Sequence, residues 1–203
     1  MIPQLSSVFG SKTKAQEVLF LLQVLKEVVR QGFYEPELPA VEMFCRNKKL
    51  FAVKSRFKVL LADKVEETLA DGHYSNKGVR ISEQDPRPGM YFVYISKDER
   101  KAWLASYYER IRNDQELGLL LGYPSCCVDF FCQHFNAQKT NLQAAPANLW
   151  TNLTKRDQDA VLLSHFPCTS DCKESIIIAM KNLNFLATVE PQRARELAAL
   201  LKV

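Results

Sequence analysis

Strand-like and helix-like patterns occupy different parts of this chain, and this segregation constrains the fold most strongly. Residues 90–96 (MYFVYIS) are rich in aromatic and β-branched side chains and predict a buried strand. After residue 97, apolar residues recur mainly at helical spacing. We therefore predict an α+β fold with an N-terminal helix, a small antiparallel or mixed sheet and a mainly helical second half. The expected subdomains are 1–97 and 98–203, unless the two form one continuous domain.

The first half is expected to begin with a helix and to continue with short strands. Residues 14–31 carry apolar side chains at helical spacing, and Gly32 follows where a C-terminal cap belongs. Two short apolar runs flank a polar turn within residues 41–54, which predicts a β-hairpin. Residues 58–70 are predicted to be helical, and residues 79–81 to form a short strand.

The second half is expected to contain a series of helices. Pro124 and Pro191 suit first helical positions, and Asp171 with Glu174 has the spacing of a capping box. The stretch around Pro146 predicts irregular structure. The predicted helices are 98–112, 114–121, 124–136, 171–188 and 191–202.

Composition narrows the class of protein. Of 203 residues, 47% are hydrophobic and 25% are charged, which is enough apolar material for a core and argues against wholesale disorder. The sequence contains no run of about 18 apolar residues and no basic segment followed by an apolar stretch at its start. We therefore expect a cytoplasmic protein without a membrane span, in which thiols stay reduced. The net charge of +4 permits an anionic partner without requiring one.

Two short segments contain a set of side chains that bind soft metals. The segment GYPSCCVDFFCQHF (122–135) contains Cys126 and Cys127, and HFPCTSDC (165–172) contains His165, Cys168 and Cys172. Thiolates with an imidazole are ligands for zinc or an iron–sulfur centre. Cys168 and Cys172 are four residues apart, so they share a helix face or span a turn and can converge on one ion. His165 is either a further ligand or a structural residue.

The adjacent cysteines pose a geometric problem. Successive side chains of a regular helix point about 100° apart, so Cys126 and Cys127 can share a metal only if the chain there is still a turn. Otherwise one of the two cysteines binds the metal and the other packs against neighbouring side chains. The start of a helix also lowers a thiol pKa, which would suit a metal-free thiol nucleophile at either residue. Cys45 and Cys132 are predicted to pack as small apolar residues, Cys132 within the apolar stripe of its helix.

The two segments together resemble a family of uncharacterised prokaryotic proteins, a domain of unknown function. The matching residues are Gly122-Tyr123-Pro124-Ser125-Cys126-Cys127 and, later, His165-Phe166-Pro167-Cys168 with Cys172. The resemblance covers residues from about 100 to 188. It implies that the two cysteine pairs belong together, and it implies no reaction.

A second candidate surface is the basic predicted hairpin at residues 46–58. Its lysines and arginines alternate with Phe44, Phe51 and Phe57, as in a groove that binds nucleic acid. The same pattern arises when the aromatic rings face the core and the cations face water, which we favour. If the cations and the aromatic rings instead share one exposed surface, we expect that surface to contact nucleic acid or an acidic protein.

Three functions remain open from sequence. The first is a metalloprotein with a cysteine-ligated zinc or iron–sulfur centre, either enzymatic or not. The second is a metal-free thiol-redox or thiol-nucleophile protein. The third is a non-enzymatic module that binds RNA or protein and has structural cysteines. The sequence contains no phosphate-binding glycine loop, no H-E-x-x-H and no G-x-S-x-G motif.

Overall fold

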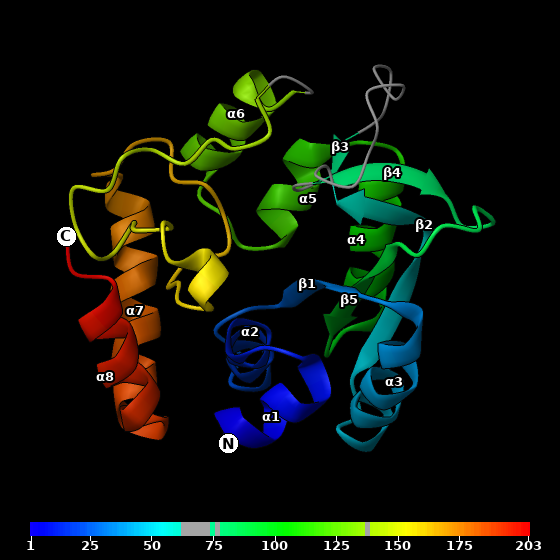
Figure 1. Ribbon diagram of the computed structural model, residues 1–203, viewed down its shortest axis with the longest axis horizontal. Helices are drawn as coiled ribbons and strands as arrows, with labels where there is room; N and C mark the ends of the chain where they lie inside the picture. The colour runs from blue at the N-terminus through cyan, green and yellow to red at the C-terminus, as the bar shows by residue number, and fades with distance from the viewer. Residues whose placement is uncertain (62–73, 76–77, 137–138) are drawn as a thin grey trace.

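A five-stranded antiparallel sheet lies in the first half of the chain (Figure 1). The computed structural model describes residues 1–61, 74–75, 78–136 and 139–203. The order of the strands across the sheet is β1-β5-β2-β4-β3. The strands are β1 (Val28–Phe33), β2 (Phe51–Leu61), β3 (Tyr74–Ser75), β4 (Gly78–Ser82) and β5 (Met90–Ser96).

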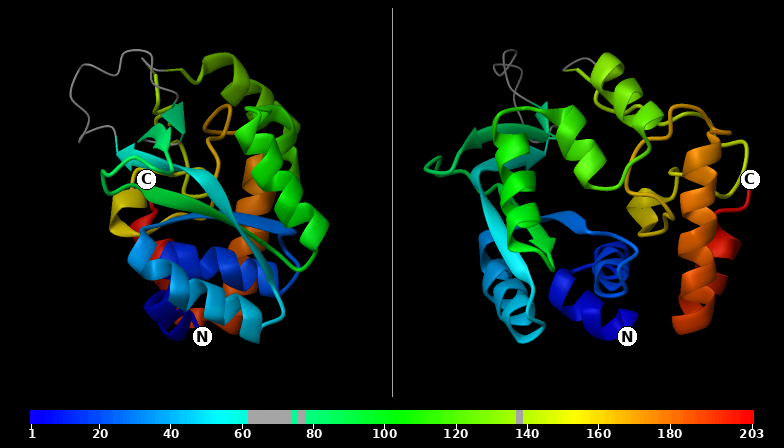
Figure 2. Two further views of the ribbon diagram at one scale, coloured as in Figure 1. Left: turned by 90° about the vertical axis from the view of Figure 1, so that its right-hand side faces the viewer. Right: turned by 180° about the vertical axis from the view of Figure 1, so that it is seen from behind.

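Three helices precede β2 and five follow β5, which confirms the α+β class. Figure 2 shows α7 and α8 side by side at one edge of the molecule, with α3 and α4 at the other. The helices are α1 (Ile2–Phe9), α2 (Lys12–Leu22), α3 (Leu38–Asn47), α4 (Glu99–Arg110), α5 (Asp114–Leu120), α6 (Ser125–His134), α7 (Lys173–Val189) and α8 (Pro191–Leu200).

The strand β5, which lies between β1 and β2, is covered on both faces. Tyr91, Val93 and Ile95 point into a large apolar cluster with α1, α2 and α3, whereas Phe92 and Tyr94 point into a second cluster with α4 and α5. This alternation follows from the two-residue period of a strand. Because both faces of the strand are buried, its sequence is a continuous apolar run, and this run is the pattern that predicts the strand.

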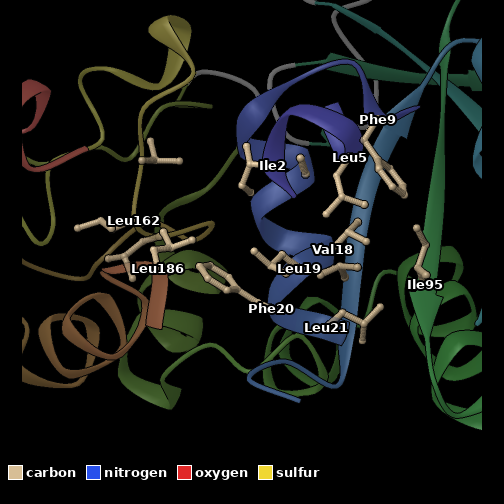
Figure 3. Close-up of a cluster of buried hydrophobic side chains, with 14 of the residues drawn as sticks. Ile2, Leu5, Phe9, Val18, Leu19, Phe20, Leu21, Ile95, Leu162 and Leu186 are labelled. Carbon is tan, nitrogen blue, oxygen red and sulfur yellow. The ribbon is translucent and has the colours of Figure 1, made fainter. Parts of the chain in front are cut away.

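The larger cluster joins both halves of the chain. Phe20 of α2 points towards Leu162 and Leu186 of the second half (Figure 3). Its ring also lies edge-on to Phe185, at 6.0 Å between ring centroids. A division of the chain near residue 97 stays a prediction.

The helix predicted over residues 14–31 is wrong in its second part. The helix α2 ends at Leu22, and Val28–Phe33 forms β1, which pairs along its whole length with β5. Val24 has a positive φ of 61°, which breaks the helix where the sequence shows no glycine. The backbone groups of the β-branched residues Val28 and Val29 therefore form hydrogen bonds within the sheet. Gly32 is a strand residue rather than a helix cap.

The predicted hairpin at 41–54 is also wrong. The helix α3 occupies Leu38–Asn47 because Leu38, Val41 and Cys45 recur at helical spacing and are buried together. The chain then turns into β2, which includes residues 58–61 of the segment predicted as helix. The remainder of that predicted helix, residues 62–70, lies outside the described residues.

The basic segment at residues 46–58 does not present one surface of cations and aromatic rings. Phe44 packs on Phe9, and Phe57 packs on Phe92, so both rings face apolar clusters. Lys58 is buried and donates hydrogen bonds to backbone carbonyls of the loop that follows β4. Phe44 and Phe57 therefore follow the interpretation in which the aromatic residues face the core, whereas Phe51 is exposed.

The helices predicted after residue 97 are confirmed, with ends within three residues of the predicted ones. The described residues between α6 and α7 are irregular, except for an isolated bridge between Asn136 and Lys139 and the short 3₁₀ helix Arg156–Gln158. The predicted cap at Asp171 is wrong, because α7 begins with Cys172 as its N-cap. Among the described residues, none of the helices has both the length and the apolar character needed to cross a membrane.

Candidate metal centre

The first arm of the centre is the start of α6. Gly122 has a φ of 77°, a left-handed conformation that glycine adopts without strain, and Pro124 is the N-cap of the helix. Gly118 of α5 lies against Val128, where an added Cβ would be 2.7 Å from the Val128 side chain. This close contact between α5 and α6 holds the first turn of α6 in place.

Cys126 and Cys127 are both helical, and their sulfur atoms are nevertheless 3.9 Å apart. The prediction that a regular helix keeps them from one centre is therefore wrong. In an α-helix the Cα–Cβ bonds tilt towards the N-terminus. Side chains of the first turn consequently reach past the end of the helix, where no preceding turn separates them.

The second arm is the irregular segment that ends at α7. Cys172 is the N-cap of α7, and its amide donates to the Thr169 carbonyl, which closes a turn between Cys168 and Cys172. The Asn148 side-chain amide and the Thr151 hydroxyl both donate to the Ser170 carbonyl inside this turn. These side-chain hydrogen bonds position a loop that has no strand or helix of its own.

The structure brings the four predicted cysteines together. Their sulfur atoms all lie within 4.8 Å of one another. The Cys172 sulfur is 3.8 Å from that of Cys126 and 3.6 Å from that of Cys127. With zinc–sulfur bonds of about 2.3 Å, a tetrahedral site has sulfur–sulfur edges of roughly 3.8 Å. All six cysteines of the chain are free thiols, so no disulfide accounts for this proximity.

Hydrogen bonds and helix ends add to the thiolate character of the site. The Cys168 amide donates to the Cys127 sulfur at 3.4 Å. Both α6 and α7 begin at the cluster, and a helix N-terminus carries partial positive charge. Four thiolates around a divalent cation have a net negative charge, which these donors and helix ends would stabilise.

The pKa values of the thiols differ within the cluster. Burial raises the pKa of Cys126 to about 11 and also raises the pKa of Cys127. Burial also acts to raise the pKa of Cys172. Hydrogen bonds from Ser175 and from neighbouring thiols outweigh burial there and lower the pKa to about 7. The prediction of a lowered pKa at Cys126 or Cys127 is therefore wrong, because desolvation outweighs the effect of the helix end there.

His165 lies behind the four thiols rather than among them. Its Nε2 atom is 2.9 Å from the Ser175 hydroxyl, and that hydroxyl is 3.3 Å from the Cys127 sulfur. The imidazole is 7% exposed and packs against Tyr123 at 5.0 Å between ring centroids. Burial, with the charges of Lys26 and Arg156, lowers the His165 pKa to about 3, so the ring is neutral at physiological pH.

Of the other two cysteines, one behaves as predicted. Cys45 is 2% exposed and packs in the large apolar cluster. Cys132 is exposed, so its predicted place among buried side chains is wrong. The buried residues of α6 are Cys127 and Val128, in the first half of the helix, so its buried stripe is shorter than its sequence suggests.

A buried charge cluster lies between the sheet and α4, and the sequence does not reveal it. Glu109 of α4 is 0% exposed. Its carboxylate accepts hydrogen bonds from Arg30 at 2.9 Å, from Arg80 at 3.1 Å and from the Tyr94 hydroxyl at 2.9 Å. These residues come from β1, β4, β5 and α4, so no local spacing predicts their convergence.

Residues 102–202 match the family described as "Protein of unknown function (DUF483)". This match runs from α4 to α8 and includes both cysteine segments. It supports the resemblance to a domain of unknown function over that part of the chain. The chain matches no curated protein and no solved structure.

Proposed function

We propose that this protein is a metalloprotein in which Cys126, Cys127, Cys168 and Cys172 bind one metal ion, either zinc or a single iron. The observation that supports the proposal is the mutual approach of four sulfur atoms within 4.8 Å. Free buried cysteines usually occur singly as small apolar residues, and four in contact at the ends of two helices point to a shared ligand.

The compactness of the sulfur set favours a single ion over an iron–sulfur cluster. In a cluster the cysteines bind different iron atoms, so at least some of their sulfur atoms lie farther apart than one tetrahedral edge. The sulfur atoms of Cys126, Cys127 and Cys172 are 3.6–3.9 Å apart, which matches one such edge, and the Cys168 sulfur lies within 4.8 Å of all three. His165 then supports the site from behind, through Ser175, rather than acting as a ligand.

A set of four protein thiols fills a tetrahedral site, which is typical of a structural metal rather than a catalytic one. The ion would join the start of α6 to the start of α7 and to the turn before it. We therefore propose a structural role, in which the metal holds the irregular residues between α6 and α7 against the helices.

Metal analysis of protein purified without oxygen tests the proposal. We expect about one equivalent of zinc or iron per chain, and less than about a tenth of an equivalent in the Cys168→Ser/Cys172→Ser variant. The matched control is Cys45→Ala/Cys132→Ser, which also removes two thiols and should retain the metal. Cobalt substitution should produce the intense visible bands of a tetrahedral thiolate site. Equal metal content in the two double variants would contradict the assignment.

A second candidate function is a metal-free thiol nucleophile at Cys172. The observation in its favour is the lowered pKa of about 7, since the thiolate is the reactive form. Alkylation of metal-free protein by iodoacetamide should then follow a midpoint near pH 7 at Cys172. Stoichiometric metal in freshly purified protein, with Cys172 protected from alkylation until the metal is removed, would exclude this candidate.

A further inference from the structure

A pocket lies beside the candidate metal centre, between α5, α6 and the irregular residues 156–166. It has a volume of about 90 Å³, and an adjoining pocket of about 260 Å³ shares Arg30, Tyr123 and Arg156 with it. Cys127 and His165 form part of the wall, so the pocket touches the centre without containing the four sulfur atoms. Its space suits a small ligand rather than a macromolecule.

The pocket wall combines cations with apolar side chains. The cations are Arg30, Arg80 and Arg156. Leu117, Val128 and Phe131 cover the side formed by α5 and α6. A wall of this kind fits a molecule that has an anionic group at one end and an apolar body at the other.

Two of the three arginines share a single carboxylate. Arg30 and Arg80 both bind the same oxygen of Glu109, at 2.9 and 3.1 Å. Within the described part of the chain, the Nε atom of Arg80 is buried and has no hydrogen-bond partner. An unsatisfied buried donor is costly, so the Arg80 guanidinium is incompletely compensated in the unliganded protein.

Arg156 is the third cation, and it is poorly compensated. Its guanidinium lies over the Phe166 ring at 5.4 Å and forms none of the ion pairs found among the described residues. Burial lowers its pKa, while Tyr123, Asp157 and Glu17 act in the opposite direction without reaching ion-pair distance. Arg156 is half-buried, so its guanidinium is partly desolvated without a close counter-ion and gains from an anion that enters the pocket.

The charges lining the pocket do not cancel among the described residues. Asp114 is also in the wall, and burial together with Glu109 raises the pKa of its carboxyl group. Even with Asp114 ionised, the three guanidinium groups of the wall face one carboxylate in the wall, and Glu109 behind it is shared by Arg30 and Arg80. An excess positive charge therefore remains in a partly desolvated space.

We propose that this pocket binds a small organic anion whose carboxylate or phosphate group pairs with Arg156, in the field of Arg30 and Arg80, and whose apolar body packs on Leu117, Val128 and Phe131. The planar guanidinium is suited to either oxyanion, because its parallel N–H groups match two oxygens. The site is built by the packing of α5 and α6 on the sheet and on residues 156–166, and its charge does not depend on the metal.

Calorimetric titration of the purified protein with phenyl phosphate, benzoate and neutral benzamide tests the proposal. At least one of the two anions should bind with a Kd of about 1 mM or tighter, and benzamide should bind at least about tenfold more weakly. Arg156→Gln should weaken anion binding about tenfold or more, because a charge-assisted hydrogen bond is lost. Arg195→Gln, the same substitution at an exposed position of α8, is the matched control and should bind as the wild type does.

Two further measurements separate binding from folding. Unliganded Arg156→Gln should unfold at a temperature no lower than the wild type, because the change removes a half-buried charge without a close counter-ion, and its metal content should be unchanged. Arg156→Lys keeps the charge and should retain part of the phenyl phosphate affinity. The proposal is overturned if neither anion binds at about 10 mM, if benzamide binds equally well, or if Arg156→Gln and Arg156→Lys both bind as the wild type does.

Discussion

Different interactions hold the sheet and the described residues between α6 and α7 in place. The central strands pair along their lengths and are covered on both faces by apolar side chains. Residues 139–172 contain one short 3₁₀ helix and depend largely on side chains that bind backbone carbonyls. A segment without a backbone ladder needs cross-links to hold one conformation, because ordering each residue costs about 1–2 kcal/mol of conformational entropy.

The cysteine cluster lies at the end of that segment, where such a cross-link has the greatest effect. Further side-chain hydrogen bonds anchor the segment at other points. Asn182 of α7 donates to the Leu162 carbonyl at 2.9 Å, and Asn152 donates to the Leu201 carbonyl at 3.1 Å. The comparison indicates that the proposed metal would hold residues 139–172 in one conformation, as strand pairing holds the sheet.

Removal of the metal should therefore affect the two regions very differently. After treatment with 1,10-phenanthroline, we expect amides near Cys168 and Cys172 to exchange with solvent about a thousandfold faster or more, because binding free energies of about 10 kcal/mol are typical of structural zinc sites. Amides of β5 should remain protected. Hydrogen exchange followed by mass spectrometry measures both. Equal loss of protection in β5 would show that the regions unfold as one unit and would break the comparison.

The charge cluster on the sheet should be the next most sensitive point. Glu109→Gln leaves Arg30 and Arg80 without their shared carboxylate, so we expect the free energy of unfolding to fall by about 3–5 kcal/mol. Urea denaturation monitored by circular dichroism measures it. The control is Glu116→Gln at an exposed position of α5, for which we expect a change within about 0.5 kcal/mol. A loss at Glu109 as small as at Glu116 would mean that apolar packing alone holds the sheet region.

The neutral imidazole at His165 should make stability depend on pH. Its pKa of about 3 in the folded protein lies below the ordinary value of about 6.5, so only the unfolded chain gains this proton as the pH falls. The contribution of the neutral His165 ring to the free energy of unfolding is complete above pH 6.5 and declines as the pH falls towards 3. Between about pH 7 and 5 we expect a loss of about 2 kcal/mol that His165→Asn lacks. Urea denaturation of both proteins at the two pH values measures this difference, and equal slopes would contradict it.

The smallest effect should come from one anchor of the irregular segment. Asn182→Ala removes the hydrogen bond to the Leu162 carbonyl, so we expect a loss of about 1 kcal/mol. The control is Asn184→Ala, the same substitution at an exposed position of the same helix. Both variants change helix propensity equally, so the difference between them reports the lost hydrogen bond. Denaturation curves of the two variants provide the comparison. A difference below about 0.5 kcal/mol would assign the order of the segment to the cysteines and apolar contacts alone.

The prediction from sequence was accurate where local periodicity and burial agree. The strand β5 and the helices after residue 97 have patterns that few other structures can satisfy, and the cysteines that converge are the four proposed from their spacing. Residues 14–31 and 41–54 were assigned incorrectly because short apolar runs are compatible with both helix and strand. In those segments, pairing with β5 and packing against α1 and α2 decided between the two.

Local sequence therefore determined the class of the fold, most of the second-half helices and the identity of the four thiols. Tertiary structure alone decided how these elements combine at the two sites. The first turn of α6 lets Cys126 and Cys127 meet Cys172, and four separate elements bring Arg30, Arg80, Tyr94 and Glu109 together. The physical reason is range: helix and strand patterns act between residues a few positions apart, whereas desolvation and charge pairing act between side chains that meet only after the chain has folded.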